Sequence, residues 1–128
     1  MAKEYSYYPG CSSQKGASGS NLQRSLNTVL DVLDIKLNDI PDWNCCSASI
    51  GYSGGGELPR LALSARNIAL SEKHNPGQEI VASCAACWLA TRETKERLEH
   101  SEQMREGTEQ ALKEAHLEIS RECQKYVI

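Results

Sequence analysis

The feature that most constrains this sequence is its set of six cysteines. The chain of 128 residues has the length of one ordinary domain. It shows no apolar run typical of an export signal near its start, and none of about 18 residues that could span a membrane. We therefore expect a cytoplasmic protein, and cysteines in a reducing compartment rarely persist as structural disulfides. The six are Cys11, Cys45, Cys46, Cys84, Cys87 and Cys123.

Hydrophobic patterning predicts an α/β fold. Residues 5–8 (YSYY) form a β-favouring run that ends at a Pro-Gly turn, and residues 34–40 and 79–83 are also predicted strands. Apolar residues at helical spacing predict helices between the strands and after the last one. This order favours a small parallel three-stranded sheet with helices packed on it. The predicted helices cover about residues 19–34, 58–74, 85–100 and 105–123.

Five of the cysteines follow the predicted strands. Cys11 comes just after the first strand, Cys45-Cys46 after the second and Cys84 at the end of the third. Because parallel strands end at one edge of the sheet, where open α/β folds place their ligands, we expect these residues to meet there. Cys87 lies one helical turn beyond Cys84 and can reach the same point. Five thiols in one place are unfavourable unless something binds them.

The number of sulfur donors bears on what is bound. Soft thiolate ligands select zinc, copper(I) or iron–sulfur clusters. Zinc normally takes four ligands in a tetrahedron, which leaves one of five cysteines unused. The adjacent side chains of Cys45 and Cys46 diverge in extended backbone, and this suits a centre with several metal ions. The ligand count therefore favours an iron–sulfur cluster, with zinc as the alternative. Cys84 and Cys87 alone would predict a thioredoxin-like redox pair.

The same cysteines carry a family resemblance. Cys11, 33 intervening residues, Cys45-Cys46, 37 intervening residues and Cys84-x-x-Cys87 resemble the frame of the cysteine-rich CCG domain. The words YSYYPGCS (5–12), DWNCC (42–46), ARNIAL (65–70) and CAACW (84–88) are similar to the B subunits of heterodisulfide reductases, over about residues 5–90. Together with the chain length, the resemblance predicts a single CCG-type domain over residues 1–128, and composition and helical spacing predict that 91–128 form a charged helical C-terminal part.

The resemblance also implies a function. Members of this family hold a non-cubane [4Fe–4S] cluster, and here its ligands would be Cys11, Cys45, Cys46, Cys84 and Cys87. In the family the centre reductively cleaves the disulfide between coenzymes M and B, or a related disulfide. Electrons would arrive from a ferredoxin-like C subunit and a flavin-bearing A subunit. Two alternatives stay open, which are an electron-transfer or assembly domain that touches no substrate and a zinc-stabilised interaction module.

Two departures from the family pattern matter. Position 47 is Ser where the family has Gly, so we expect either a negative φ or a local hydrogen bond there. The chain also carries one cysteine motif, whereas such subunits usually carry two. We therefore expect a second CCG domain to come from another chain or from a homodimer, with a fragment of a two-motif subunit as the alternative.

The other notable residues are predicted to have ordinary structural roles. The net charge of −3 argues against a sequence-independent grip on nucleic acid or anionic lipid. The triple glycine at 54–56 lacks the frame of a phosphate-binding loop and reads as a linker. Cys123 is expected on the apolar side of the last helix. We expect surface positions for the histidines, packing near the site for the tryptophans and a place along the approach for small residues, namely His74, His100, His116, Trp43, Trp88, Gly10, Ser12 and Ser47.

Overall fold

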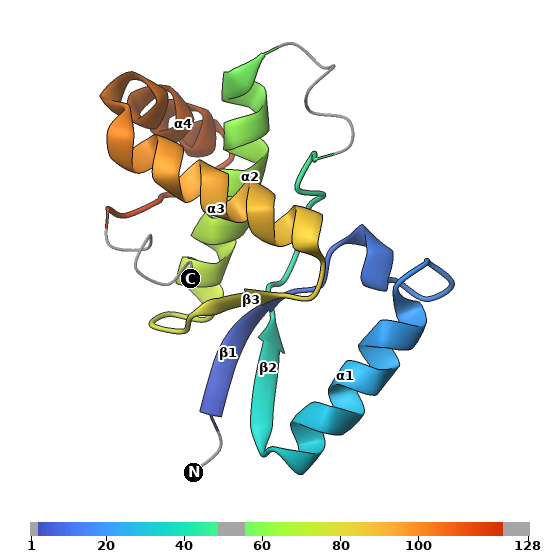
Figure 1. Cartoon of the computed structure of the whole chain (residues 1–128). Helices are drawn as coiled ribbons and strands as arrows, with labels where there is room; N and C mark the ends of the chain where they lie inside the picture. Colours follow the sequence, from blue (N-terminus) through green and yellow to red (C-terminus); the bar gives the residue numbers. More distant parts are fainter. Residues whose placement is uncertain (1–2, 49–55, 122–128) are drawn as a thin grey trace.

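A parallel three-stranded sheet forms the centre of the fold (Figure 1). The computed structural model describes residues 3–48 and 56–121. Strand β1 (Lys3–Tyr8) lies between β2 (Ile35–Asp39) and β3 (Ile80–Ala82), which gives the order β2-β1-β3 with both pairings parallel. The predicted α/β class and parallel sheet are therefore confirmed, with strand bounds within two residues of those expected.

The helices lie on the two sides of this sheet. Figure 1 shows α1 (Ser20–Val32) beside β2, and α2 (Glu57–His74), α3 (Ala85–His100) and α4 (Glu102–Glu114) gathered on the other side. Alternation along β1 explains the division, because side chains on a strand project to opposite faces in turn. The Ser6 hydroxyl is 2.6 Å from that of Ser71 in α2, whereas the Tyr7 hydroxyl donates to Gln23 in α1.

The core forms between the sheet and α2. One face of α2 is almost completely buried, and it meets Tyr8 of β1, Leu98 of α3 and Leu112 of α4. Burial of apolar side chains contributes roughly 25 cal/mol per Å² removed from water, so this layer supplies the main stabilising term of the fold. The buried face of α2 comprises Leu61, Ser64, Ala65, Asn67, Ile68, Ala69, Leu70 and Ser71.

Helix α1 is less buried than its apolar periodicity predicts. It contains no fully buried residue, and Leu22, Val29 and Val32 are 59%, 51% and 82% exposed. Its contacts within the described residues come mainly from β2 and the turn after β1. The periodicity therefore identified the helix correctly, although most of its apolar stripe faces solvent.

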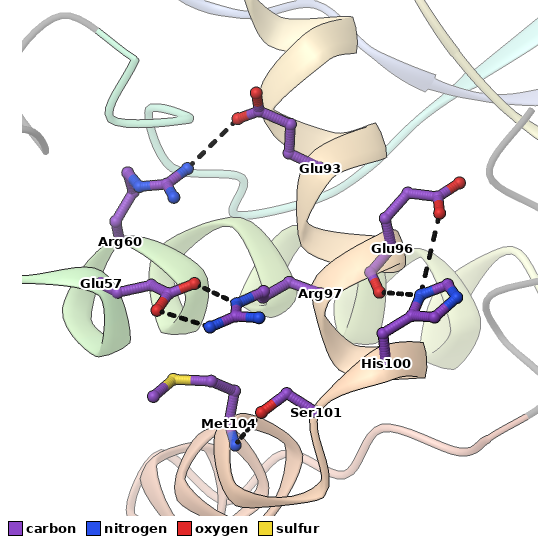
Figure 2. Close-up of polar contacts among 8 residues, drawn as sticks. All are labelled: Glu57, Arg60, Glu93, Glu96, Arg97, His100, Ser101 and Met104. Atoms are coloured by element: carbon purple, nitrogen blue, oxygen red, sulfur yellow. Dashed lines mark hydrogen bonds and ion pairs between the residues drawn. The ribbon is translucent and has the colours of Figure 1, made fainter.

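Ion pairs join the charged helices at their exposed faces (Figure 2). Glu57 of α2 pairs with Arg97 of α3, and Arg60 Nη1 lies 3.4 Å from Glu93 Oε2. At the junction of α3 and α4, the Ser101 hydroxyl accepts a hydrogen bond from Met104 N at 3.3 Å and caps α4. Exposed pairs of this kind contribute about 0–1 kcal/mol each, so they orient α3 on α2 more than they stabilise it.

The last helix is shorter than predicted. Helix α4 ends at Glu114, whereas residues up to 123 were expected to be helical. His116 adopts φ 57°, and Leu117 N donates to Leu112 O at 2.9 Å, which is the arrangement of a Schellman motif. Leu117 and Ile119 are still buried, because the chain turns back over the core after this motif. Cys123 lies outside the described residues, and so do Gly54 and Gly55 of the triple glycine.

Replacing His116 by Gly is predicted to raise the free energy of unfolding by about 0.5–1 kcal/mol. Glycine adopts φ 57° without the steric cost that a β-carbon carries, and this gain exceeds the entropy that it adds to the unfolded chain. Urea unfolding of the metal-free protein measures the difference. His74→Gly is the control, because His74 is the last helical residue of α2 and the same change there is expected to lower stability by about 0.3–0.5 kcal/mol. Equal effects of the two substitutions would contradict the assignment.

Candidate metal centre

One of the predicted cysteines, Cys87, is in contact with two others. Cys84 is the N-cap residue of α3 and Cys87 lies in its first turn. The thiol of Cys87 is hydrogen bonded both to Cys84 and to Cys46, which arrives from the loop after β2. Cys46 and Cys87 are buried, with exposed fractions of 5% and 4%, and Cys84 is half-buried. The fold therefore joins two segments that are nearly 40 residues apart in the sequence.

Cys45 lies beside this group. It is half-buried, and its Sγ accepts a hydrogen bond from Ser47 N at 3.4 Å. The sulfurs of Cys87, Cys46 and Cys45 lie close enough to the buried Tyr8 hydroxyl to raise its pKa electrostatically, so all three lie near the end of β1.

Cys11 is the exposed member of the set. It begins the short helical turn Cys11–Ser13 that follows β1. Both of its neighbours reach the other cysteines, since Ser12 is hydrogen bonded to Cys84 and Gly10 faces Cys87. Gly10 has φ +72°, and a β-carbon built on it would lie 2.8 Å from Cys87 Sγ. Only glycine fits this position, because both the backbone conformation and the close approach of the sulfur exclude a side chain.

Ser47 departs from the expectation of a negative φ. Its φ is +63°, which is the conformation that favours glycine at this position in the family pattern. The local hydrogen bond that we expected in the absence of a negative φ is present, because Ser47 N donates to Cys45 Sγ. The side chain is 1% exposed, and its hydroxyl has no partner among the residues that the structure describes. A buried hydroxyl beside several thiols is thus left to donate to a further acceptor.

The pKa values of Cys84 and Cys87, the two cysteines of the CAAC segment, are shifted in opposite directions. The backbone N–H of Cys87 donates to Cys84, and with the N–H of Ala86 and the Ser12 hydroxyl it lowers the pKa of that thiol. Burial raises the pKa of Cys87, and the neighbouring Cys46 raises it further. Burial likewise raises the pKa of Tyr8, so its hydroxyl stays protonated and donates to Asn44 O at 2.7 Å. Several thiolates can share this buried space only if a cation offsets their charge.

The donor set fits a metal centre of the soft class. Thiolate sulfur is its principal ligand atom, and the orphaned Ser47 hydroxyl offers a hydrogen bond to a bound sulfur. Within residues 3–48 and 56–121, the one group of three potential ligands with all donor atoms inside 4.8 Å is the exposed set Glu96, Glu99 and His100. No three cysteine sulfurs among these residues therefore lie as close to one another as the roughly 3.8 Å that tetrahedral zinc with 2.3 Å bonds requires.

The other predicted residues fall as follows. Trp43 packs edge-on against Tyr8 with ring centroids 5.7 Å apart, which confirms its packing role. Trp88 is 44% exposed in the first turn of α3, so its predicted packing is only partial. The three histidines are exposed, as expected; they are His74, His100 and His116.

Sequence reasoning missed the polar residues that support the cysteines. Tyr8 was interpreted only as part of a strand, and Asn44 and Asn67 only as letters of the family words rather than as partners. The sequence pattern could have identified Asn67, because an amide at a core position of an apolar helix must find a hydrogen-bond partner.

Replacing Gly10 by Ala is predicted to lower the free energy of unfolding by about 2–3 kcal/mol. A β-carbon would collide with Cys87 Sγ in addition to straining the backbone. Gly16→Ala isolates the backbone cost of about 1 kcal/mol, because Gly16 also has a positive φ (+82°) but no atom lies within 4 Å of its added β-carbon. Denaturant unfolding of both variants measures the difference, and equal losses would refute the close approach.

Cys84 is predicted to be alkylated at lower pH than Cys87 in the reduced, metal-free protein. A lowered pKa gives Cys84 a substantial thiolate fraction below its ordinary value of 9.0, whereas burial keeps Cys87 protonated. Mass spectrometry after iodoacetamide pulses between pH 6 and about 9 would follow each thiol. Faster modification of Cys87 than of Cys84 across this range would reverse the proposed asymmetry.

The chain was compared with known protein families and curated proteins. Residues 5–92 match the model of the family named CCG, described as a cysteine-rich domain. The membrane anchor subunit of the 8-methylmenaquinol:fumarate reductase of Wolinella succinogenes is 34% identical over 99 residues, which is 77% of this chain and 33% of that protein.

Two further relatives come from Methanosarcina. The B subunit of the ferredoxin/F(420)H(2)-dependent CoB-CoM heterodisulfide reductase of Methanosarcina acetivorans is 29% identical over 118 residues, 92% of this chain and 38% of the relative. The B subunit of the ferredoxin:CoB-CoM heterodisulfide reductase of Methanosarcina mazei is 26% identical over 98 residues, 77% of this chain and 32% of the relative. The chain spans about a third of the length of these three curated relatives.

Proposed function

Because this chain belongs to the cysteine-rich CCG domain family, we propose that it is an iron–sulfur redox domain. The observation that carries the proposal is the buried contact of Cys46 with Cys87 and of Cys87 with Cys84. These thiols come from separate loops, and Cys45 lies next to them around Tyr8. The proposed ligands are Cys11, Cys45, Cys46, Cys84 and Cys87, and the proposed group is a non-cubane [4Fe–4S] cluster. A structural zinc ion stays the alternative.

The exposure of the cysteines gives the proposed site a direction. Cys46 and Cys87 are buried, Cys45 and Cys84 are half-buried and Cys11 is exposed. Such a cluster would supply electrons for reductive cleavage of an S–S bond. A substrate would approach on the Cys11 side, because Cys11 is the exposed member of the set, and the adjacent Ser12 is hydrogen bonded to Cys84. On the inner side, the buried Tyr8 packs against the partly buried Trp43.

The relatives suggest two uses for the electrons. Two of them are named as B subunits of CoB-CoM heterodisulfide reductases, which supports cleavage of that disulfide or a related one. The relative with 34% identity is named as the membrane anchor of an 8-methylmenaquinol:fumarate reductase. This second name favours an electron-transfer domain that touches no disulfide, and we keep it as the second candidate.

All three relatives are named as subunits, and this supports a role within a complex. The proposed partners are a ferredoxin-like C subunit, a flavin-bearing A subunit and a second CCG domain from another chain or a homodimer. Among the described residues, the helices fall short of the length and apolar character needed to cross a bilayer. The cytoplasmic location and the single-domain organisation over residues 1–128 stay predictions.

Replacing Cys46 by Ala is predicted to abolish iron retention and the broad visible absorption of protein reconstituted anaerobically with iron and sulfide. Cys46 is the buried link from the loop after β2 to α3, so its loss divides the ligand set. Cys123→Ala, outside the five-cysteine frame, is the matched control and should keep the wild-type spectrum. Full iron content in the Cys46 variant would count against the proposed ligand set.

The same reconstituted protein separates the two uses. After reduction, addition of a coenzyme M–coenzyme B disulfide should restore the oxidised spectrum if the domain acts on disulfides. Restoration by an oxidised electron carrier alone would favour the electron-transfer candidate instead.

A further inference from the structure

Asn44, the residue that precedes the double cysteine, is fixed by hydrogen bonds at every polar atom. Its backbone N–H donates to Asn67 Oδ1 at 3.0 Å. Its carbonyl oxygen accepts from Tyr8 Oη at 2.7 Å and from Asn67 Nδ2 at 2.9 Å, so both lone pairs are used. Its own side chain donates to Cys45 O and Leu63 O, and accepts from Arg66.

Asn67 is the central partner in this arrangement. It lies on the buried face of α2 and is 3% exposed. Its amide group both accepts from and donates to the backbone of Asn44, in the manner of a paired β-strand. A buried amide without partners costs about 1–3 kcal/mol, so α2 and the loop after β2 hold each other in one register. We call this pairing the Asn44–Asn67 clamp.

The clamp is linked directly to the cysteines. Asn44 Nδ2 donates to Cys45 O at 2.8 Å, which fixes the peptide between the two cysteines. Tyr8, the other donor to Asn44 O, is hydrogen bonded to Cys87 and lies near Cys46 and Cys45. The orientation of the double cysteine is thereby set by β1 and α2, two elements that contribute no ligand of their own.

We propose that Asn67 is a positioning residue that presets the Cys45–Cys46 pair before any metal binds. The backbone of the pair would then need little rearrangement when a metal centre forms, and Cys46 would stay buried in the metal-free protein. This inference rests on the proposed function only for the identity of the bound group, because every contact in it belongs to the chain itself.

Arg66 gives a second but weaker attachment. Its guanidinium donates to Asp42 O at 2.7 Å and lies 2.6 Å from Asp42 Oδ2. The Asp42 side chain is 81% exposed, so solvent screens this ion pair. The buried amide of Asn67 therefore carries the positioning role.

The test compares the rate at which Cys46 is alkylated in reduced, metal-free variants. Asn67→Ala removes both bonds to Asn44, and Asn67→Asp keeps the size and the acceptor but lacks the donor. Asn75→Ala is the matched control, because its Nδ2 also makes two bonds, to Ser6 Oγ and Asn38 O, at the C-terminal end of the same helix. Alkylation of Cys46 should rise about tenfold in both Asn67 variants, the factor expected for the loss of one or two net hydrogen bonds. It should stay near the wild-type rate in the control.

Further measurements separate a failure of the positioning role from a failure of the proposed function. Hydrogen exchange at the Asn44 amide should accelerate in Asn67→Ala, which lacks the acceptor of its N–H, and much less in Asn67→Asp, which keeps that acceptor. If Asn67→Ala fails to fold, the Cys46 rate in Asn67→Asp still decides the test. Cys46 rates in the Asn67 variants that match Asn75→Ala would overturn the positioning role. Failure of the wild-type chain to take up iron would instead overturn the proposed function, while the rate comparison would still decide the role of Asn67.

Discussion

Sulfur atoms that are buried together without a counter-charge set the constraint on which this structure depends. Cys46 and Cys87 lie in contact inside the protein, and burial raises the pKa of Cys87. Ionising several such thiols is unfavourable unless a cation joins them, so these thiols either stay protonated or share a bound cation. The rest of the molecule can be understood as the framework that holds these thiols in place despite that cost.

The sheet and two of the helices, α2 and α3, contribute to this framework. Strand β1 occupies the centre of the sheet and ends at Tyr8, against which the cysteines gather. The N-terminus of α3 supplies backbone N–H groups that stabilise the Cys84 thiolate. Helix α2 contributes no ligand but holds the double-cysteine loop through Asn67. The exposed Cys11 leaves one side of the group open, which is where a redox partner or substrate could approach.

Patterns along the sequence were enough for the strands, the first three helices and the meeting of Cys46, Cys84 and Cys87, because period and order act locally or through simple sheet topology. They failed where a residue departs from its usual preference. His116 ends α4 in a conformation typical of glycine, and Ser47 adopts a positive φ beside the cysteines. The Asn67 contact could not be inferred, because a single polar residue in an apolar helix does not specify which backbone it meets. The periodicity of α1 predicts an apolar stripe but does not encode whether another element covers it, and in the structure α1 has no buried residue.

The central claim is that the gathered cysteines hold iron and sulfide together. Metal and acid-labile sulfide analysis of the wild-type chain, purified without oxygen, tests it most directly. The account predicts iron and sulfide in equal amounts, about four of each per chain, as for a [4Fe–4S] centre. One zinc ion per chain without sulfide would contradict it and leave a structural metal site in its place.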